Sequence, residues 1–107
     1  MTNAIVVLST CSSEEEASRI ARELIEDQLA ACVNILSPVR SFYRWKGKVC
    51  DEKEWLLLIK TGRETFEALE NKVKSLHSYE VPELICLPVL GGSFAYLEWM
   101  EETLRKF

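Results

Sequence analysis

Histidine, glycine and proline are scarce in this chain of 107 residues, which contains one histidine, four glycines and three prolines. No stretch rich in proline, glycine or serine divides it, so we expect a single domain over residues 1–107. No apolar run approaches the ~20 residues that span a membrane, and the opening run, residues 4–8, is too short for a signal peptide. We therefore expect a cytoplasmic protein with no membrane partner.

Basic residues are also few, since 13 Lys and Arg face 17 Asp and Glu and the net charge is −4. Proteins that hold nucleic acid through its phosphates carry basic surfaces, so we expect no nucleic-acid partner. The cysteines stand at positions 11, 32, 50 and 86, and no two form a Cys-x-x-Cys pair. This scatter favours reduced thiols over a disulfide framework.

What the chain has in abundance is β-forming sequence in its middle, over residues 31–61. Two such runs flank Lys46-Gly47-Lys48, which is the sequence form of a β-hairpin. The first run, residues 31–44, would span on the order of 45 Å when extended, whereas a globule of this length is roughly 34 Å across. We therefore expect a long central hairpin that extends beyond its own domain, with a bulge or bend at Ser37-Pro38.

Strands and helices alternate along the rest of the chain. The pattern predicts a strand at residues 4–8, a helix from Ser12 or Ser13 to about residue 28, a second helix over residues 66–76, a strand at 84–90 and a third helix after Ser93. The order βαββαβ with a C-terminal helix predicts an α+β, ferredoxin-like fold with both crossover helices on one face of the sheet. Several strands are apolar on both faces, so we expect a second subunit to cover the open face.

The densest group of chemically capable residues is HSYEVPE at residues 77–83. His77, the only histidine, is either a helix-end residue that suits the dipole or a metal ligand or proton donor. Cys32, at the start of the long strand, is either a buried strand cysteine or a soft ligand for copper. A single histidine supports no specific nucleophile–base pair, so we do not expect an enzyme and assign no catalytic residue.

Two aromatic residues and two lysines lie near the hairpin. Tyr43 and Trp45 are two apart, so they share a strand face and are typical of interface anchors. Lys46 and Lys60 are either surface or pairing lysines or groups that neutralise an anion.

Five segments, in this order and spacing, closely resemble the CutA family of divalent-cation tolerance proteins. They are LAACVNI at 29–35, SFYRWKGK at 41–48, the strand end at 60–61, HSYEVPE at 77–83 and YLEW at 96–99. The resemblance covers nearly the whole chain. It implies a ferredoxin-like fold assembled as a homotrimer through strand pairing between subunits, and an architecture like that of the PII signalling proteins. It also implies a role in tolerance of copper and other divalent cations, with no established reaction.

The chain departs from the family pattern at two places. The family's usual proline after the histidine of the fourth segment is Ser78 here. Copper ligation in some members uses a cysteine late in the first strand and two adjacent histidines, and these places hold Ser9, Leu76 and His77. Cys11 lies two residues beyond Ser9, on the same strand face if the strand extends that far.

Three functions follow as hypotheses. The first is a cytoplasmic homotrimer that binds copper or another divalent cation weakly or transiently, with His77 and Cys32 as ligands. The second is a PII-like sensor that binds a small anionic ligand in a cleft between subunits. That cleft would use Tyr43, Trp45, Lys46, Lys60, Tyr79 and Glu83. The third is a structural trimeric scaffold.

Overall fold

The computed structural model describes residues 2–105. Its elements are β1 (Ala4–Cys11), α1 (Glu14–Glu26), β2 (Cys32–Trp45), β3 (Lys48–Gly62), the short 3-10 helix η1 (Arg63–Thr65), α2 (Phe66–Leu76), β4 (Ile85–Pro88) and α3 (Phe94–Leu104). The strands form one antiparallel sheet in the order β2-β3-β1-β4. Two interleaved βαβ crossovers give this order, so the predicted α+β, ferredoxin-like fold is confirmed.

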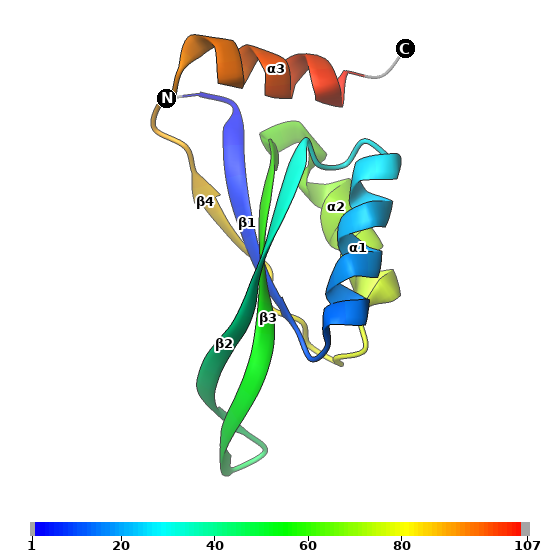
Figure 1. Cartoon of the computed structure of the whole chain (residues 1–107), viewed down its shortest axis with the longest axis vertical. Coiled ribbons are helices and arrows are strands. Elements are labelled where there is room, and N and C mark those ends of the chain that lie inside the picture. The colour runs from blue at the N-terminus through cyan, green and yellow to red at the C-terminus, as the bar shows by residue number, and fades with distance from the viewer. Residues whose placement is uncertain (1, 106–107) are drawn as a thin grey trace.

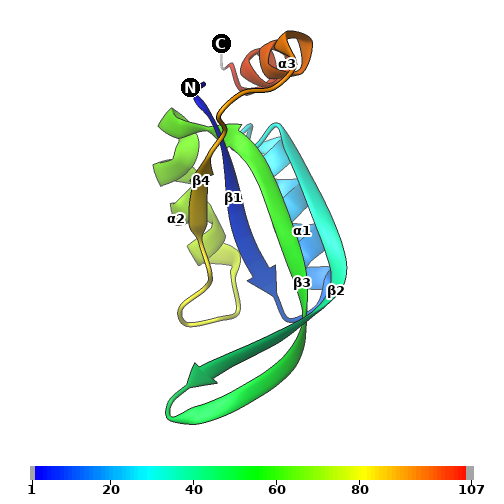
Figure 2. The same cartoon turned by 90° about the vertical axis from the view of Figure 1, so that its left-hand side faces the viewer.

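The sheet separates a covered face from an open one. Helices α1 and α2 pack together against one face, while α3 lies across one end (Figures 1 and 2). Alternate strand residues point toward the helices and are buried there with apolar helix residues, namely Ile5, Val7, Leu57 and Ile59 with Ile20, Leu24, Leu69 and Val73. Each such side chain contributes about 1.5–3 kcal/mol by leaving water. This layer is the core of the chain.

The opposite face of the sheet carries apolar residues that no helix covers. Figure 2 looks onto this face, with α1 and α2 behind the sheet. Val6 and Leu8 lie on it, and their partners on the edge strand β4 are Leu87 and Ile85. Leu87 and Ile85 remain 44% and 49% exposed. As the apolar pattern predicted, two helices cover only one side of the sheet.

The hairpin of β2 and β3 is the longest feature of the molecule. The principal extents are 44 × 26 × 22 Å, and the hairpin tip extends beyond the helices (Figure 1). The pairing register shifts between Leu36 and Val39, on either side of the predicted bulge at Ser37-Pro38. The predicted overshoot and the bulge are therefore both confirmed.

The ends of two strands differ from the prediction. β1 extends to Cys11 rather than residue 8, because Ser9, Thr10 and Cys11 continue the pairing with β3 although the apolar run has ended. β4 ends at Pro88 rather than residue 90, and it pairs with β1 alone among the described strands. Proline has no amide hydrogen to extend a ladder, which agrees with its place at the end of this edge strand.

Helix α1 starts at one of the two predicted capping serines. Ser13 is the N-cap, and its Oγ accepts a hydrogen bond from the Glu16 amide at 3.1 Å. The side chain of Glu16 does not close a capping box. Its Oε2 instead accepts from the Ser78 amide at 2.7 Å, which joins the start of α1 to the loop after α2. The helix ends at Glu26, two residues before the predicted end.

This cap generates a first prediction. Ser13→Ala should lower the free energy of unfolding by about 1 kcal/mol, because the Glu16 amide loses its acceptor. The exposed Ser12 offers the matched control, and Ser12→Ala should leave stability unchanged. Urea unfolding at one fixed protein concentration measures both. Equal effects of the two substitutions would contradict the assignment of the cap.

Candidate functional site

A groove of about 750 Å³ lies between the outer half of the hairpin and the loop formed by residues 78–83 (the 78–83 loop). Figure 2 shows this loop facing the part of the hairpin that curls beneath it. The groove brings together four of the predicted site residues, namely Tyr43, Trp45, Tyr79 and Glu83. It also includes Glu54 from β3, which the sequence reasoning did not single out.

A buried tyrosine–carboxylate pair joins the hairpin to the loop. The Tyr79 hydroxyl donates to Oε2 of Glu54 at 2.6 Å, and Glu54 is only 5% exposed. Burial, followed by this hydrogen bond and the charge of Glu54, raises the pKa of Tyr79 well above its usual range. On the hairpin, Tyr43 donates to Oε1 of Glu52 at 3.2 Å. Partial burial and that bond raise the pKa of Tyr43 to about 12. Both phenols therefore remain donors at neutral pH.

The groove is acidic. Three carboxylates line it, from Glu54, Glu80 and Glu83, and its lining within residues 2–105 includes no lysine or arginine. Burial, followed by the nearby charge of Glu54, raises the pKa of Glu83. The charge of Glu54 disfavours ionisation of Glu83, and a groove lined by carboxylates attracts cations and repels anions.

The two predicted anion-binding lysines lie elsewhere. Lys46 is in the hairpin turn, with its ammonium 5.8 Å from the ring centroid of Trp45. Lys60 is near the other end of β3, opposite Val6 and Cys32, and its ammonium is 5.7 Å from the ring centroid of Tyr96 in α3. One chain therefore does not assemble both lysines around the groove.

His77 joins the end of β1 to the start of the 78–83 loop. Its Nδ1 lies 3.0 Å from the Tyr79 amide nitrogen, and its Nε2 lies 2.7 Å from the Thr10 carbonyl oxygen. A backbone amide can only donate, so Nδ1 accepts and Nε2 carries the proton that the carbonyl accepts. His77 is also the C-cap of α2, where its own amide donates to Val73. The helix-end role considered from the sequence is thus present.

The same imidazole lies next to a thiol and a carboxylate. Ligand atoms of Cys11, Glu16 and His77 all lie within 4.8 Å of one another, and we call these residues the Cys11–Glu16–His77 cluster. Cys11 Sγ is 3.8 Å from His77 Nε2. A sulfur and a nitrogen bound to one tetrahedral ion, at 2.3 Å and 2.0–2.1 Å, stand roughly 3.6 Å apart. In addition, Oε1 of Glu16 is buried with no hydrogen-bond partner among the described residues. The donor set therefore fits a divalent ion.

A metal ion that binds at this cluster must displace protons from its ligands. Burial, followed by the charges of Glu16 and Glu54, raises the pKa of the Cys11 thiol to about 12. A thiol binds metal as a thiolate, so a bound ion would have to displace that proton. It would also have to displace the Nε2 proton that the Thr10 carbonyl accepts. Because two protons must be displaced, we expect a metal ion to bind weakly rather than tightly.

The other predicted ligand, Cys32, lies apart from the cluster. It pairs with Lys60 near the opposite end of β1, and its thiol is 3.9 Å from Oδ1 of Asn34. Within one chain, Cys32 and His77 therefore do not lie close enough to bind the same ion. The sequence analysis did not single out Glu16 as a site residue. Its role depends on the contact between the start of α1 and the end of α2, which no local pattern shows.

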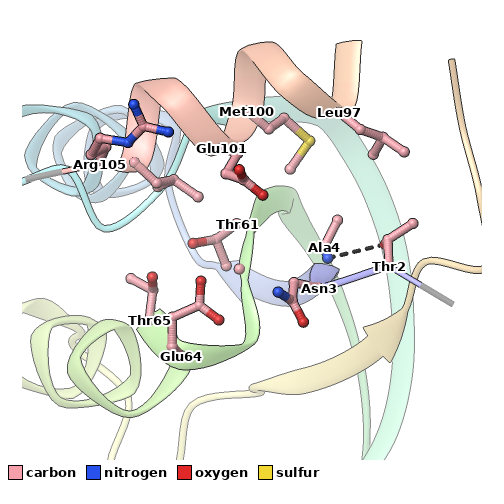
Figure 3. Close-up of a pocket in the computed structure, with 12 residues that line it drawn as sticks. Thr2, Asn3, Ala4, Thr61, Glu64, Thr65, Leu97, Met100, Glu101 and Arg105 are labelled. Atoms are coloured by element: carbon pink, nitrogen blue, oxygen red, sulfur yellow. Dashed lines mark hydrogen bonds between the residues drawn. The ribbon is translucent and has the colours of Figure 1, made fainter. Parts of the chain in front are cut away.

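A second cavity, of about 310 Å³, lies beneath α3 at the other end of the sheet (Figure 3). The side chains of Glu64 and Glu101 point into it, and Met100 and Leu97 form its apolar side. None of the predicted site residues lines this cavity. The groove and the Cys11–Glu16–His77 cluster together are therefore the candidate site.

The tyrosine–carboxylate pair generates a second prediction. Tyr79→Phe should lower the free energy of unfolding by about 1–3 kcal/mol, because it leaves the buried Glu54 carboxylate without its donor. Tyr43→Phe removes an equivalent hydroxyl from a more exposed bond and should change stability much less. Urea unfolding of the two variants side by side makes the measurement. A larger loss for Tyr43→Phe would overturn this account of the groove.

Comparison with known proteins shows the family of the chain. The family described as CutA1 divalent ion tolerance protein matches residues 5–103. The divalent-cation tolerance protein CutA of Thermus thermophilus is 50% identical over 98 residues, covering 92% of this chain and 95% of that protein. A chloroplastic CutA 1 protein of Oryza sativa is 45% identical, and the chain spans 58% of its length.

A solved structure shows the same fold. The periplasmic divalent cation tolerance protein CutA of Archaeoglobus fulgidus superposes with a TM-score of 0.93 and is 39% identical, covering 95% of this chain and 99% of that one. The sequence match and the structural match both extend over nearly the whole chain. The chain therefore belongs to the CutA1 family of divalent ion tolerance proteins.

Proposed function

We propose that this protein contributes to divalent-cation tolerance by binding copper or another divalent cation at the Cys11–Glu16–His77 cluster. The observation that carries the proposal is the convergence of a thiol, a carboxylate and an imidazole within 4.8 Å. Thiolate and imidazole suit copper and zinc. The names of relatives such as the Thermus thermophilus protein support the same cation class.

Binding at this cluster is weak and reversible, because the ion competes with two protons and a backbone hydrogen bond. Such binding suits a protein that buffers a cation rather than one that holds it permanently. The role is not catalytic, and no bond of a substrate is made or broken. It needs a reduced Cys11, and thiols stay reduced in the cytoplasm. We therefore keep the cytoplasm as the proposed compartment.

The proposed working form is a homotrimer in which neighbouring copies cover the open face of the sheet. The support is the apolar surface that α1 and α2 leave uncovered, including Ile85 and Leu87 on the edge strand. The hairpin extends well beyond its own domain and offers strand surface to a second copy. The geometry of one chain does not support a PII-like anion sensor. The groove is acidic, and Lys46 and Lys60 lie apart from each other.

The metal site generates a third prediction. Cys11→Ser and His77→Ala should each lower the affinity for copper by roughly tenfold or more, which is about 1.4 kcal/mol. Cys50→Ser is the matched control, since Cys50 lies on the hairpin away from the cluster, and it should bind as the parent does. Native mass spectrometry of the reduced protein, titrated with copper, reports metal stoichiometry and subunit number together. If Cys11→Ser binds copper with unchanged affinity, the cluster is not the metal site, and a scaffold role is favoured.

The open face generates a fourth prediction. Leu87→Glu should dissociate the trimer, because it places a charge on an apolar surface that the assembly buries. Ile25 in α1 is exposed to a similar degree, 41% against 44%, but lies on the helix side, so Ile25→Glu should leave the trimer intact. Light scattering after size-exclusion chromatography measures both masses. Persistence of the trimer in Leu87→Glu would contradict the proposed interface.

A further inference from the structure

We propose that the groove between the hairpin and the 78–83 loop is a second binding site, separate from the Cys11–Glu16–His77 cluster, for a linear organic amine. The ligand class is an alkyl diamine or polyamine, with ammonium groups at the ends of an apolar chain. This inference goes beyond the proposed metal function and does not depend on it.

Charge is the first argument. Glu54, Glu80 and Glu83 line the groove, and none of them forms an ion pair with a described residue. Glu54 is almost fully buried with only the Tyr79 hydroxyl as a side-chain partner within residues 2–105. A buried carboxylate without a cation is costly, and an ammonium group beside it would relieve that cost.

Aromatic surface is the second argument. Phe42, Tyr43, Trp45 and Tyr79 line the same groove as the carboxylates. Phe42, Trp45 and Tyr43 remain 63%, 43% and 38% exposed, so their rings are accessible to a ligand. Ring faces attract ammonium groups and also pack against alkyl chains. Two of these rings already have cationic partners in the chain, since the Arg40 guanidinium is 4.9 Å from the Phe42 centroid and Lys46 lies near Trp45.

Spacing distinguishes this ligand from a metal ion. Within residues 2–105, the carboxylates of the groove do not converge on one point as the atoms of the Cys11–Glu16–His77 cluster do. Glu54 comes from β3, and Glu80 and Glu83 come from the loop. The volume of about 750 Å³ falls in the range of small-molecule sites and far exceeds that of an ion. Carboxylates and aromatic rings that line one groove match a ligand that carries both ammonium groups and an alkyl chain.

The test is an amide NMR titration of the full chain with putrescine, in the presence of a chelator so that no metal contributes. Putrescine should shift amides of the 78–83 loop and the hairpin, and butanediol, its neutral counterpart of equal length, should not. Glu83→Gln should weaken binding by roughly fivefold or more. Glu67→Gln, at an exposed position of α2, is the matched control and should bind as the parent does.

Two further variants make the result specific. Trp45→Leu keeps the apolar surface but removes the ring, and should weaken binding by roughly two- to fivefold. Cys11→Ser should leave putrescine binding unchanged, so failure of the metal site and failure of this site are distinguishable. Equal binding of butanediol, equal loss in Glu67→Gln, or shifts spread over the acidic face of α1 would overturn the proposal. Absence of any shift at millimolar putrescine would also overturn it, as expected if a lysine or arginine of a second copy fills the groove.

Discussion

The hydrogen bonds of one imidazole hold together the end of this molecule that carries the candidate site. His77 accepts from the Tyr79 amide through Nδ1 and donates to the Thr10 carbonyl through Nε2. The Glu16 carboxylate accepts a further hydrogen bond from the Ser78 amide. These bonds join the loop after α2 to the end of β1 and the first turn of α1. The groove and the Cys11–Glu16–His77 cluster both include residues that these bonds connect.

That arrangement also explains why a buried acidic region is tolerated in a small domain. Glu54 is buried within the hairpin, but the Tyr79 phenol satisfies one of its oxygens. Burial, followed by the charges of Glu16 and Glu54, raises the pKa of the Cys11 thiol, and burial followed by the charge of Glu54 raises that of the Glu83 carboxyl. A cation that binds in this region must therefore compete with protons on these groups. The proposed cation binding therefore involves the whole region.

Much of the fold was predictable because its signals are local. Ser13 caps α1, and the bulge falls at Ser37-Pro38 as the proline indicated. The continuous apolar runs of β1 and β3 indicated that both faces of these strands need cover, and two helices cover only one of them. The prediction was wrong about the length of β1, because Ser9, Thr10 and Cys11 owe their strand conformation to pairing with β3 rather than to their own composition.

The candidate site was only partly predictable, because its residues meet through long-range contacts. The sequence by itself determined the elements, the long hairpin and the family, and it singled out His77 and its loop as the densest group of chemically capable residues, since these depend on short-range pattern and ordered motifs. The tertiary structure alone decided that Glu16 and Cys11 join His77, that Glu54 faces Tyr79, and that Cys32 and Lys60 lie at the other end of the sheet. The physical reason is that strand register and helix packing place residues dozens of positions apart within hydrogen-bond distance. A one-residue change of register would turn each strand side chain to the opposite face.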